Sequence, residues 1–240
     1  MTDMNTLMMK NYIHEFKSLK KIIKKHIKDI VKETNNHNIK EAALPAYAHD
    51  NFLIDYIFWK RLEITYNLIL EKGYQRILDF GCGTGIVSFL LARKGLEVIA
   101  VDTEFEALNK MRKKMDFPPT IQFFNADLSE IPIEKKSIDV IVALDVLEHI
   151  DDLSVYMKLF CKILKKDGAV IVSGPTENGL YKIGRKIAGA DFTGGYHVSN
   201  IYKIKDQFRH QFELESTKKI FWPITLFEIF VAKPGRFYKN

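Results

Sequence analysis

The stretch Ile77–Val87, which reads ILDFGCGTGIV, constrains the fold more than any other part of the chain. An apolar run ends at Asp79, three glycines follow at every second position (Gly81, Gly83 and Gly85), and an apolar helix-like pattern then begins. Glycine has no Cβ, so it accepts positive φ and lets a ligand lie against bare backbone. The N–H groups at the start of the helix would face that ligand. The pattern therefore predicts a buried strand, a tight turn and a helix start, where doubly wound α/β folds bind nucleotides.

Two other glycine-rich loops do not fit this stretch. A phosphate-binding P-loop has Lys and then Ser or Thr after its last glycine, whereas Ile86 and Val87 follow Gly85. The dinucleotide fingerprint would have Ile86 at its third small position, where this side chain hinders the approach of the helix to a pyrophosphate. NAD is therefore disfavoured. A sharp strand-to-helix turn without a ligand remains the alternative.

Size and composition indicate one large domain, or one domain with an appendage. The chain has 240 residues, of which 47% are apolar, enough for a substantial core. Met1–Lys10 has no apolar segment of the signal-peptide type, and the longest nearly apolar run, Ile220–Ala232, is too short to span a bilayer. Two cysteines, Cys82 and Cys161, imply no disulfide framework. We therefore expect a cytoplasmic protein.

The positive charge is concentrated near the N-terminus. The net charge is +6, and residues 1–40 contain nine Lys against four acidic residues. Residues 12–33 are expected to form an amphipathic helix, because apolar residues recur at spacings of three and four: Phe16, Leu19, Ile23, Ile27 and Ile30. Its lysines are either a patch for a membrane surface or nucleic acid, or the solvated face of a helix that covers the rest of the protein.

From residue 74 the pattern alternates between strand and helix. Asn35–Asn38 is an expected break, and the aromatic-rich residues 41–71 are expected to form one or two helices. Strands are expected at 75–80, 96–102, 120–125, 137–144 and 168–174, and helices at 86–93, 104–115, 152–165, 177–188 and 199–210. Residues 213–221 and 224–233 are expected to be antiparallel strands joined around Trp222-Pro223. Such alternation predicts an α/β fold with a mostly parallel sheet covered on both faces.

Several motifs together resemble class I S-adenosylmethionine (SAM) methyltransferases of the ubiquinone-biosynthesis and related small-molecule type. The glycine turn resembles their motif I, and Asp139–Ile150 resembles motif IV and its extension. Leu164–Gly168 resembles a turn before the fifth strand, although Lys166-Asp167 stands where the family prefers Pro-Gly. The resemblance covers about residues 74–174. It implies a Rossmann-like, doubly wound sheet of seven strands with a reversed last strand in a domain of residues 73–240, preceded by a helical extension or cap of residues 1–72.

Asp102 is the strongest individual prediction for the cofactor. It ends the second strand, so it should lie beside the glycine turn, where a carboxylate accepts both ribose hydroxyl protons. Plain charge compensation at a helix N-terminus is the alternative. Thr103 and Glu106 form a T-x-x-E pattern, which predicts a capping box at the start of the next helix.

The resemblance extends the cofactor site to further residues. It implies that Asp127 accepts the adenine amino hydrogen and that Leu128 supports the ring, an Asx-type turn being the alternative for Asp127. The cofactor would be SAM, with S-adenosylhomocysteine (SAH) as product. The residues expected to line its site are Asp79, Gly81, Cys82, Gly83, Asp102, Thr103, Asp127, Leu128 and Leu144.

The acceptor is less constrained. The Asn/Asp-Pro-Pro-Tyr signature of enzymes that methylate base amines is absent, since Leu144–Leu147 reads LDVL. This favours an oxygen or carbon acceptor on a small molecule or a lipid- or sugar-linked precursor. His149 is the first candidate base and His197 the second, because a His near its reference pKa takes a hydroxyl proton at neutral pH. His149 could instead buttress the following helix.

Two alternative functions stay open. Asp145-x-x-Glu148-His149 with His197 resembles the metal-binding residues of small-RNA 2′-O-methyltransferases and of some quinone-precursor O-methyltransferases, although Asp145 stands where that pattern has Glu. A metal there would lower the pKa of the acceptor oxygens. A metal-assisted RNA ribose 2′-O-methyltransferase is therefore one alternative, and nucleic acid is not excluded. The other is a non-catalytic SAM-binding or interaction protein. The sequence predicts neither the acceptor nor the oligomeric state.

Overall fold

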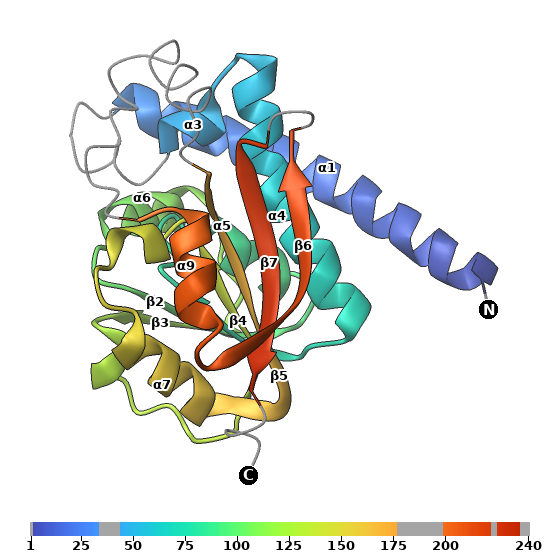
Figure 1. Cartoon of the computed structure of the whole chain (residues 1–240). Coiled ribbons are helices and arrows are strands. Elements are labelled where there is room, and N and C mark those ends of the chain that lie inside the picture. The colour runs from blue at the N-terminus through green and yellow to red at the C-terminus, as the bar shows by residue number, and fades with distance from the viewer. Residues whose placement is uncertain (1, 34–43, 177–198, 222–224, 236–240) are drawn as a thin grey trace.

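The computed structural model describes residues 2–33, 44–176, 199–221 and 225–235, with residues 2–11 described by their backbone alone (Figure 1). The expected break at Asn35–Asn38, the predicted helix at 177–188, the candidate base His197 and the Trp222-Pro223 junction lie outside the described residues.

The sheet has seven strands in the order β3-β2-β1-β4-β5-β7-β6. All pairings from β3 to β5 are parallel, and β7 is antiparallel to both of its neighbours. The strands are β1 Arg76–Phe80, β2 Glu97–Asp102, β3 Ile121–Asn125, β4 Ile138–Leu144, β5 Leu164–Pro175, β6 Phe212–Ile220 and β7 Phe227–Pro234. The predicted mostly parallel sheet with a reversed last strand is confirmed.

Helices cover both faces of this sheet. Neighbouring strand residues alternate between two hydrophobic clusters: Ile77 packs toward α5 and the N-terminal helices, whereas Leu78 packs toward α7 and α9. Such burial on both faces explains why the central strands are continuously apolar. The described helices after β1 are α5 Ile86–Ala92, α6 Glu106–Lys114, α7 Ser154–Ile163 and α9 Ile201–Phe208, with short 3₁₀ helices η1 Leu128–Glu130 and η2 Leu147–His149.

The described N-terminal helices form a layer over one face: α1 Thr2–Glu33, α3 Leu44–Ala48 and α4 Phe52–Lys72. The first extends further toward the N-terminus than the predicted helix at 12–33. Its Phe16 ring lies 6.3 Å from the Trp59 ring and 5.7 Å from the Tyr66 ring of α4, and all three belong to the cluster that includes Ile77 of β1. The helical layer and the sheet therefore share one core. The boundary at residues 72/73 stays a prediction.

The start of α4 is well defined. Asn51 is its N-cap, and the side-chain oxygen accepts from the backbone N–H groups of Leu53 and Ile54. Gly73 ends the helix in the left-handed conformation, with φ of 69°.

Within the described residues, no helix combines the length and the apolar character needed to cross a membrane.

The predicted start of the fifth strand is wrong. The stretch Leu164–Gly168, expected as a turn before the fifth strand, already belongs to β5. Leu164 pairs with Ile138, and a register shift between Ile138 and Val140 accommodates the polar residues that look like a turn in the sequence. Lys165 also pairs with Asp139 of β4, with 2.7 Å between Nζ and Oδ1. The polar residues thus extend the strand at its exposed end.

Candidate functional site

The glycine turn after β1 is tied to the end of β2 by backbone hydrogen bonds. The N–H groups of Gly81 and Cys82 both donate to the Val101 carbonyl, at 2.8 and 3.0 Å. The Gly85 N–H then donates to the Cys82 carbonyl at 2.8 Å, and α5 begins at Ile86. The predicted strand, tight turn and helix start are therefore confirmed.

The three glycines of the turn are needed for different reasons. All have positive φ, of 72° at Gly81, 51° at Gly83 and 73° at Gly85. A Cβ on Gly81 would lie 2.6 Å from the Val146 Cβ, and one on Gly85 would lie 2.6 Å from a Leu108 methyl carbon. A Cβ on Gly83 would meet no atom within 4 Å. Packing thus excludes side chains at the outer two glycines, whereas Gly83 faces open space in the pocket described below.

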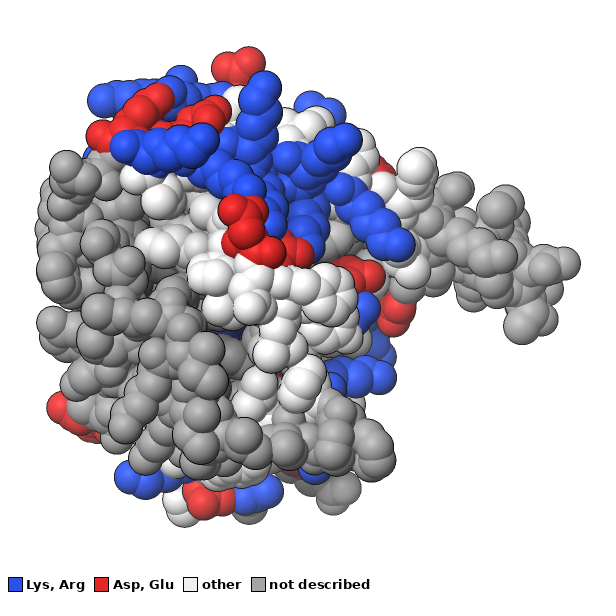
Figure 2. All heavy atoms as spheres, turned by 90° about the horizontal axis from the view of Figure 1, so that it is seen from above, with Lys and Arg blue, Asp and Glu red and all other residues white. Residues whose placement is uncertain are grey.

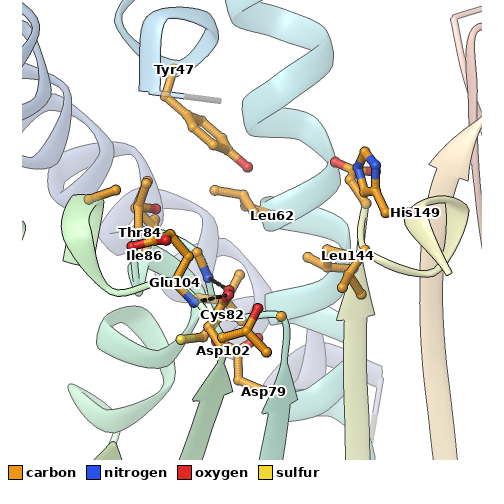
Figure 3. A pocket seen from close by; sticks show the side chains of 17 residues that line it. Tyr47, Leu62, Asp79, Cys82, Thr84, Ile86, Asp102, Glu104, Leu144 and His149 are labelled. Carbon is orange, nitrogen blue, oxygen red and sulfur yellow. Dashed lines mark hydrogen bonds between the residues drawn. The ribbon is translucent and has the colours of Figure 1, made fainter. Parts of the chain in front are cut away.

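Asp102 holds the turn from the end of β2. One carboxylate oxygen, Oδ2, accepts from the Gly83 N–H at 2.7 Å, and Oδ1 accepts from the Glu104 N–H at 3.1 Å (Figure 3). The second bond bends the chain before the helix, so α6 begins only at Glu106, with Phe105 as an N-cap that makes no side-chain cap hydrogen bond. The predicted Thr103/Glu106 capping box is therefore wrong.

Asp79 is a buried carboxyl group beneath the turn. Its side chain is 3% exposed and accepts from the Ser88 hydroxyl at 2.6 Å. Burial raises the pKa of Asp79 to about 6, and the nearby Asp102 charge adds to the rise while Ser88 opposes it. Asp79 therefore changes its charge close to neutral pH, directly under the pocket.

These residues form one wall of a pocket with a volume of about 470 Å³ (Figure 3). That volume lies within the range of small-molecule sites. The opposite wall comes from the end of β4 and from η2. The predicted site residues that line the pocket are Asp79, Gly81, Cys82, Gly83, Asp102, Thr103, Leu144 and His149. Eight of the 17 residues that line the pocket were therefore predicted from the sequence.

The helical layer covers the pocket. Tyr47 of α3 and Leu62 of α4 line it, and the Tyr47 hydroxyl points into it (Figure 3). Burial raises the pKa of Tyr47, with Arg61 opposing, so the phenol keeps its proton at neutral pH and is available as a donor. The ring packs edge-on against Phe58 and Trp59, each at 5.6 Å between ring centroids. The aromatic region 44–72 therefore contributes both core and pocket lining.

Two predicted cofactor residues do not line this pocket. Asp127 is the N-cap of η1, and its carboxylate accepts from the Ser129 N–H at 2.8 Å and from the hydroxyl of Tyr156. Leu128 is 3% exposed and belongs to the cluster under α7. The Asx-type turn considered as the alternative for Asp127 is therefore present. The adenine roles of both residues stay predictions.

An ion pair that the sequence did not predict forms part of the opposite wall. Arg61 of α4, whose side chain is 1% exposed, pairs with Asp145 just after β4. Its guanidinium lies between two rings, 4.3 Å from the Phe58 centroid and 4.4 Å from that of Phe227. Asp145 has a φ of 54° and also accepts from the Ser173 hydroxyl at 2.8 Å. No local sequence signal distinguishes Arg61 from a solvated helical arginine.

Within the described part of the chain, no cluster of His, Cys, Asp or Glu side chains could hold a metal ion. Asp145, Glu148 and His149 do not form a group able to hold a metal ion there. The Asp145 carboxylate is bound by Arg61 and Ser173, and Glu148 is 1% exposed, whereas His149 is exposed at the pocket edge. These donors therefore do not converge on one point.

The comparisons with known proteins agree with this geometry. Residues 78–172 match a family model for a methyltransferase domain. A probable SAM-dependent methyltransferase of Mycobacterium tuberculosis is 29% identical over 123 residues, which make up 51% of this chain and 44% of the relative. The mitochondrial ubiquinone biosynthesis O-methyltransferase of Homo sapiens is 32% identical over 103 residues, 41% of this chain and 28% of that protein. The aligned region spans less than half the length of both relatives.

Solved structures show the same fold. The magnesium protoporphyrin IX methyltransferase of Synechocystis PCC 6803, determined with bound SAH, has a TM-score of 0.61 and 21% sequence identity. The match covers 86% of this chain and 98% of that one. The predicted Rossmann-like arrangement is therefore confirmed across most of the chain.

Proposed function

Because this chain belongs to the class I SAM-dependent methyltransferases, we propose that it transfers a methyl group from SAM to an oxygen or carbon atom of a small-molecule or lipid- or sugar-linked acceptor. The observation that carries the proposal is the two-walled pocket: the glycine turn with Asp102 on one side, and Leu144, Asp145 and His149 on the other. One wall suits a nucleoside cofactor, and the other is left for an acceptor.

The cofactor wall fits SAM in two respects. Gly83 has open space where a Cβ would stand, so a ligand can lie directly on its backbone. Asp102 lies at the end of β2, where a carboxylate accepts hydrogen bonds from ribose hydroxyls, and it lines the pocket. When bound, SAM would supply an electrophilic sulfonium methyl group, so the protein has mainly to align the acceptor and remove its proton.

We assign the proton-accepting role to His149. It lies at the exposed edge of the acceptor wall, and a neutral imidazole accepts a hydroxyl proton at neutral pH. The human relative is named as an O-methyltransferase, which supports oxygen as the atom that accepts the methyl group. The Tyr47 hydroxyl, pointing into the same space, would orient a polar acceptor.

A cytoplasmic location belongs to the same proposal. Cys82 and Cys161 are both free and buried. Burial raises the pKa of both thiols, so they stay protonated and unreactive, as suits a reducing compartment.

Calorimetric titration with SAH, and with NAD in parallel, tests the cofactor. We expect SAH alone to bind, and Asp102→Ala to weaken it about a hundredfold through the loss of charge-assisted hydrogen bonds. Glu97→Ala, an exposed carboxylate at the other end of β2, is the matched control and should leave binding unchanged. Absence of SAH binding in the folded wild-type protein would contradict the proposal.

The role of His149 needs a separate readout. In an acceptor screen with radiolabelled SAM, His149→Gln should lose transfer about a hundredfold while keeping its SAH affinity. His210→Gln, an exposed histidine that does not line the pocket, should behave as wild type. Transfer that is unaffected by a chelator would remove the metal-assisted alternative.

A further inference from the structure

We propose that the face formed by α1 and the first turn of α4 docks onto an anionic lipid bilayer. The docking face consists of three exposed lysines of α1 and three apolar residues of α4: Lys17, Lys21, Lys25, Phe52, Leu53 and Tyr56. Its position beside the pocket would give the enzyme access to a lipid-linked acceptor. This last point rests on the proposed function, whereas the docking itself does not.

The apolar half of the docking face is unusually exposed. Phe52 is 80% exposed, and Leu53 and Tyr56 are each 39% exposed. The rings of Phe52 and Tyr56 stack with 6.2 Å between their centroids and an interplanar angle of 24°. Since Asn51 caps the helix at this point, the apolar side chains project from a fixed first turn. Exposed apolar groups on a rigid element indicate an interaction site.

Three other lysines of α1, which are ion-paired, join the basic half of the docking face to this turn. Lys20 and Lys24 both bind the Asp55 carboxylate at 2.6 Å, and Lys24 also donates to the His49 carbonyl at 2.9 Å. Lys28 pairs with Asp50. These contacts hold α1 beside the start of α4 and neutralise the two carboxylates there. The acidic groups next to the apolar residues therefore do not oppose an anionic partner.

In the part of the chain that the structure describes, the three lysines of the docking face itself carry unpaired positive charge. Lys17, Lys21 and Lys25 are exposed, and none of them forms an ion pair with the described residues. Seen from above, the basic side chains form a band that borders an uncharged region, with a few acidic groups between them (Figure 2). A basic helix beside exposed aromatic and aliphatic side chains matches the polar head groups and the acyl boundary of an anionic membrane.

A second copy of the chain fits this face less well. A symmetric dimer brings the same patch of each subunit together, so the three lysines would face only the lysines and the apolar residues of the second copy's docking face. Such like charges repel one another across an interface. A bilayer rich in anionic lipid instead provides opposite charge for the lysines and an apolar interior for Phe52 and Leu53.

The docking face lies close to the pocket. Tyr47, which lines the pocket, is in α3, immediately before the loop that leads to Phe52. The helix α3 and the start of α4 lie at the side of the sheet where the parallel strands end (Figure 1), as the glycine turn and His149 do. A protein held on a membrane by this face therefore has its pocket near the lipid head groups.

Sedimentation with lipid vesicles tests the proposal on the full chain without any cofactor. We expect binding to vesicles of phosphatidylcholine with phosphatidylglycerol and little binding to phosphatidylcholine alone. Lys17→Glu/Lys21→Glu/Lys25→Glu should lower the partition coefficient about a hundredfold. Phe52→Ser/Leu53→Ser/Tyr56→Ser should also lower it, and added salt should weaken the wild-type binding.

Matched control variants distinguish binding through this face from binding through positive charge or exposed apolar groups elsewhere on the protein. Lys135→Glu/Lys162→Glu/Lys166→Glu removes the same charge at the opposite end of the sheet, and Val155→Ser/Tyr202→Ser removes exposed apolar groups from α7 and α9. Both should bind vesicles as wild type does. Equal loss in test and control variants, equal binding to neutral vesicles, or no binding would overturn the proposal.

Two further outcomes point to other partners. Loss of a dimer in the Phe52/Leu53/Tyr56 variant, measured by sedimentation velocity, would assign the face to a second copy. Binding to RNA that the lysine variant loses, without vesicle binding, would assign it to nucleic acid. Either result overturns the membrane assignment. SAH titration of the same variants should be unchanged, so failure of docking is distinguishable from failure of the proposed function.

Discussion

Arg61 and Asp145 connect the helical layer to the end of β4 across 84 positions of the sequence. The arginine is 1% exposed and lies between two aromatic rings, and the aspartate lines the pocket. The pair therefore fixes the cover of the pocket relative to its acceptor wall. Leu62, which follows Arg61 directly in α4, lines the pocket from this cover.

We expect Arg61→Met to destabilise the protein by about 3 kcal/mol, because it leaves the Asp145 carboxylate without its cationic partner in a mostly buried position. Urea denaturation gives the free energy of unfolding. Lys60→Met is the matched control on the same helix: the Lys60 side chain, which pairs with Glu63 at i,i+3, is 34% exposed, against 1% for Arg61, so the cost should stay below about 1 kcal/mol. Similar losses in both variants would contradict this interpretation of the buried pair.

Gly83→Ala should separate ligand binding from folding. A Cβ there meets no protein atom within 4 Å, so we expect a cost of about 1 kcal/mol from the positive φ alone. The methyl group would project toward the pocket and weaken SAH binding, by about tenfold or more. Gly73 also has a positive φ, of 69° against 51° at Gly83, and the same free space, but it lies away from the pocket, so Gly73→Ala should lose similar stability and keep full SAH affinity.

The buried Asp79 carboxyl group predicts a pH-dependent difference between two proteins. Its pKa rises from 3.8 to about 6 on folding, so the folded state holds the proton more tightly than the unfolded chain. This contribution to stability is complete below pH 3.8 and is lost as the pH rises through about 6. Asp79→Asn has no such dependence. Relative to wild type, it should gain about 3 kcal/mol between pH 4 and pH 7.

Urea denaturation of both proteins across that pH range measures the difference directly. Asn can still accept the hydrogen bond from Ser88, so the local packing is kept. A difference that stays constant with pH would mean that Asp79 titrates at its ordinary pKa.

A second buried ion pair joins α9 to the centre of the antiparallel part of the sheet. Lys205 is 8% exposed and pairs with Glu228 of β7, which is 2% exposed. Lys205→Met alone should cost about 3 kcal/mol, whereas Lys205→Met/Glu228→Leu should recover most of that loss because no buried charge remains unpaired. Lys203→Met, exposed on the same helix, should be neutral. Thermal unfolding of the four proteins provides the comparison, and a double variant less stable than the single one would contradict it.

The sequence predicted the parts of the fold that depend on local patterns. The parallel strands follow from their apolar runs, and the turn after Phe80 follows from glycine chemistry. The aromatic-rich region 41–71, expected to form one or two helices, contains α3 and most of α4. The start of β5 was missed because Lys165–Gly168 is polar: these residues lie between Leu164 and Ala169, which pair with Ile138 and Val140 of β4 on either side of a register shift. The helix start at Glu106 was missed because a hydrogen bond to the Asp102 side chain bends the backbone before it.

The candidate site was predictable on its cofactor side more than on its acceptor side. Asp79 and Asp102 lie at the carboxyl ends of the neighbouring strands β1 and β2, so the sheet topology alone places both beside the glycine turn. Tyr47 and Leu62, which cover the pocket, belong to helices. The apolar periodicity of a helix does not predict which of its faces lines a pocket. The partner of Asp145 comes from the same layer. Contacts of this kind depend on the docking of helices onto the sheet, which the pattern of one segment does not contain.

The contact between Gly81 and Val146 has a consequence for how such sequences change over time. The Val146 side chain occupies the space that a side chain at position 81 would need, so the two positions share one volume. One of them can become larger only if the other becomes smaller. Among descendants of this gene, we therefore expect a substitution at position 81 to appear only together with a smaller residue at 146, and positions 85 and 108 to be coupled in the same way.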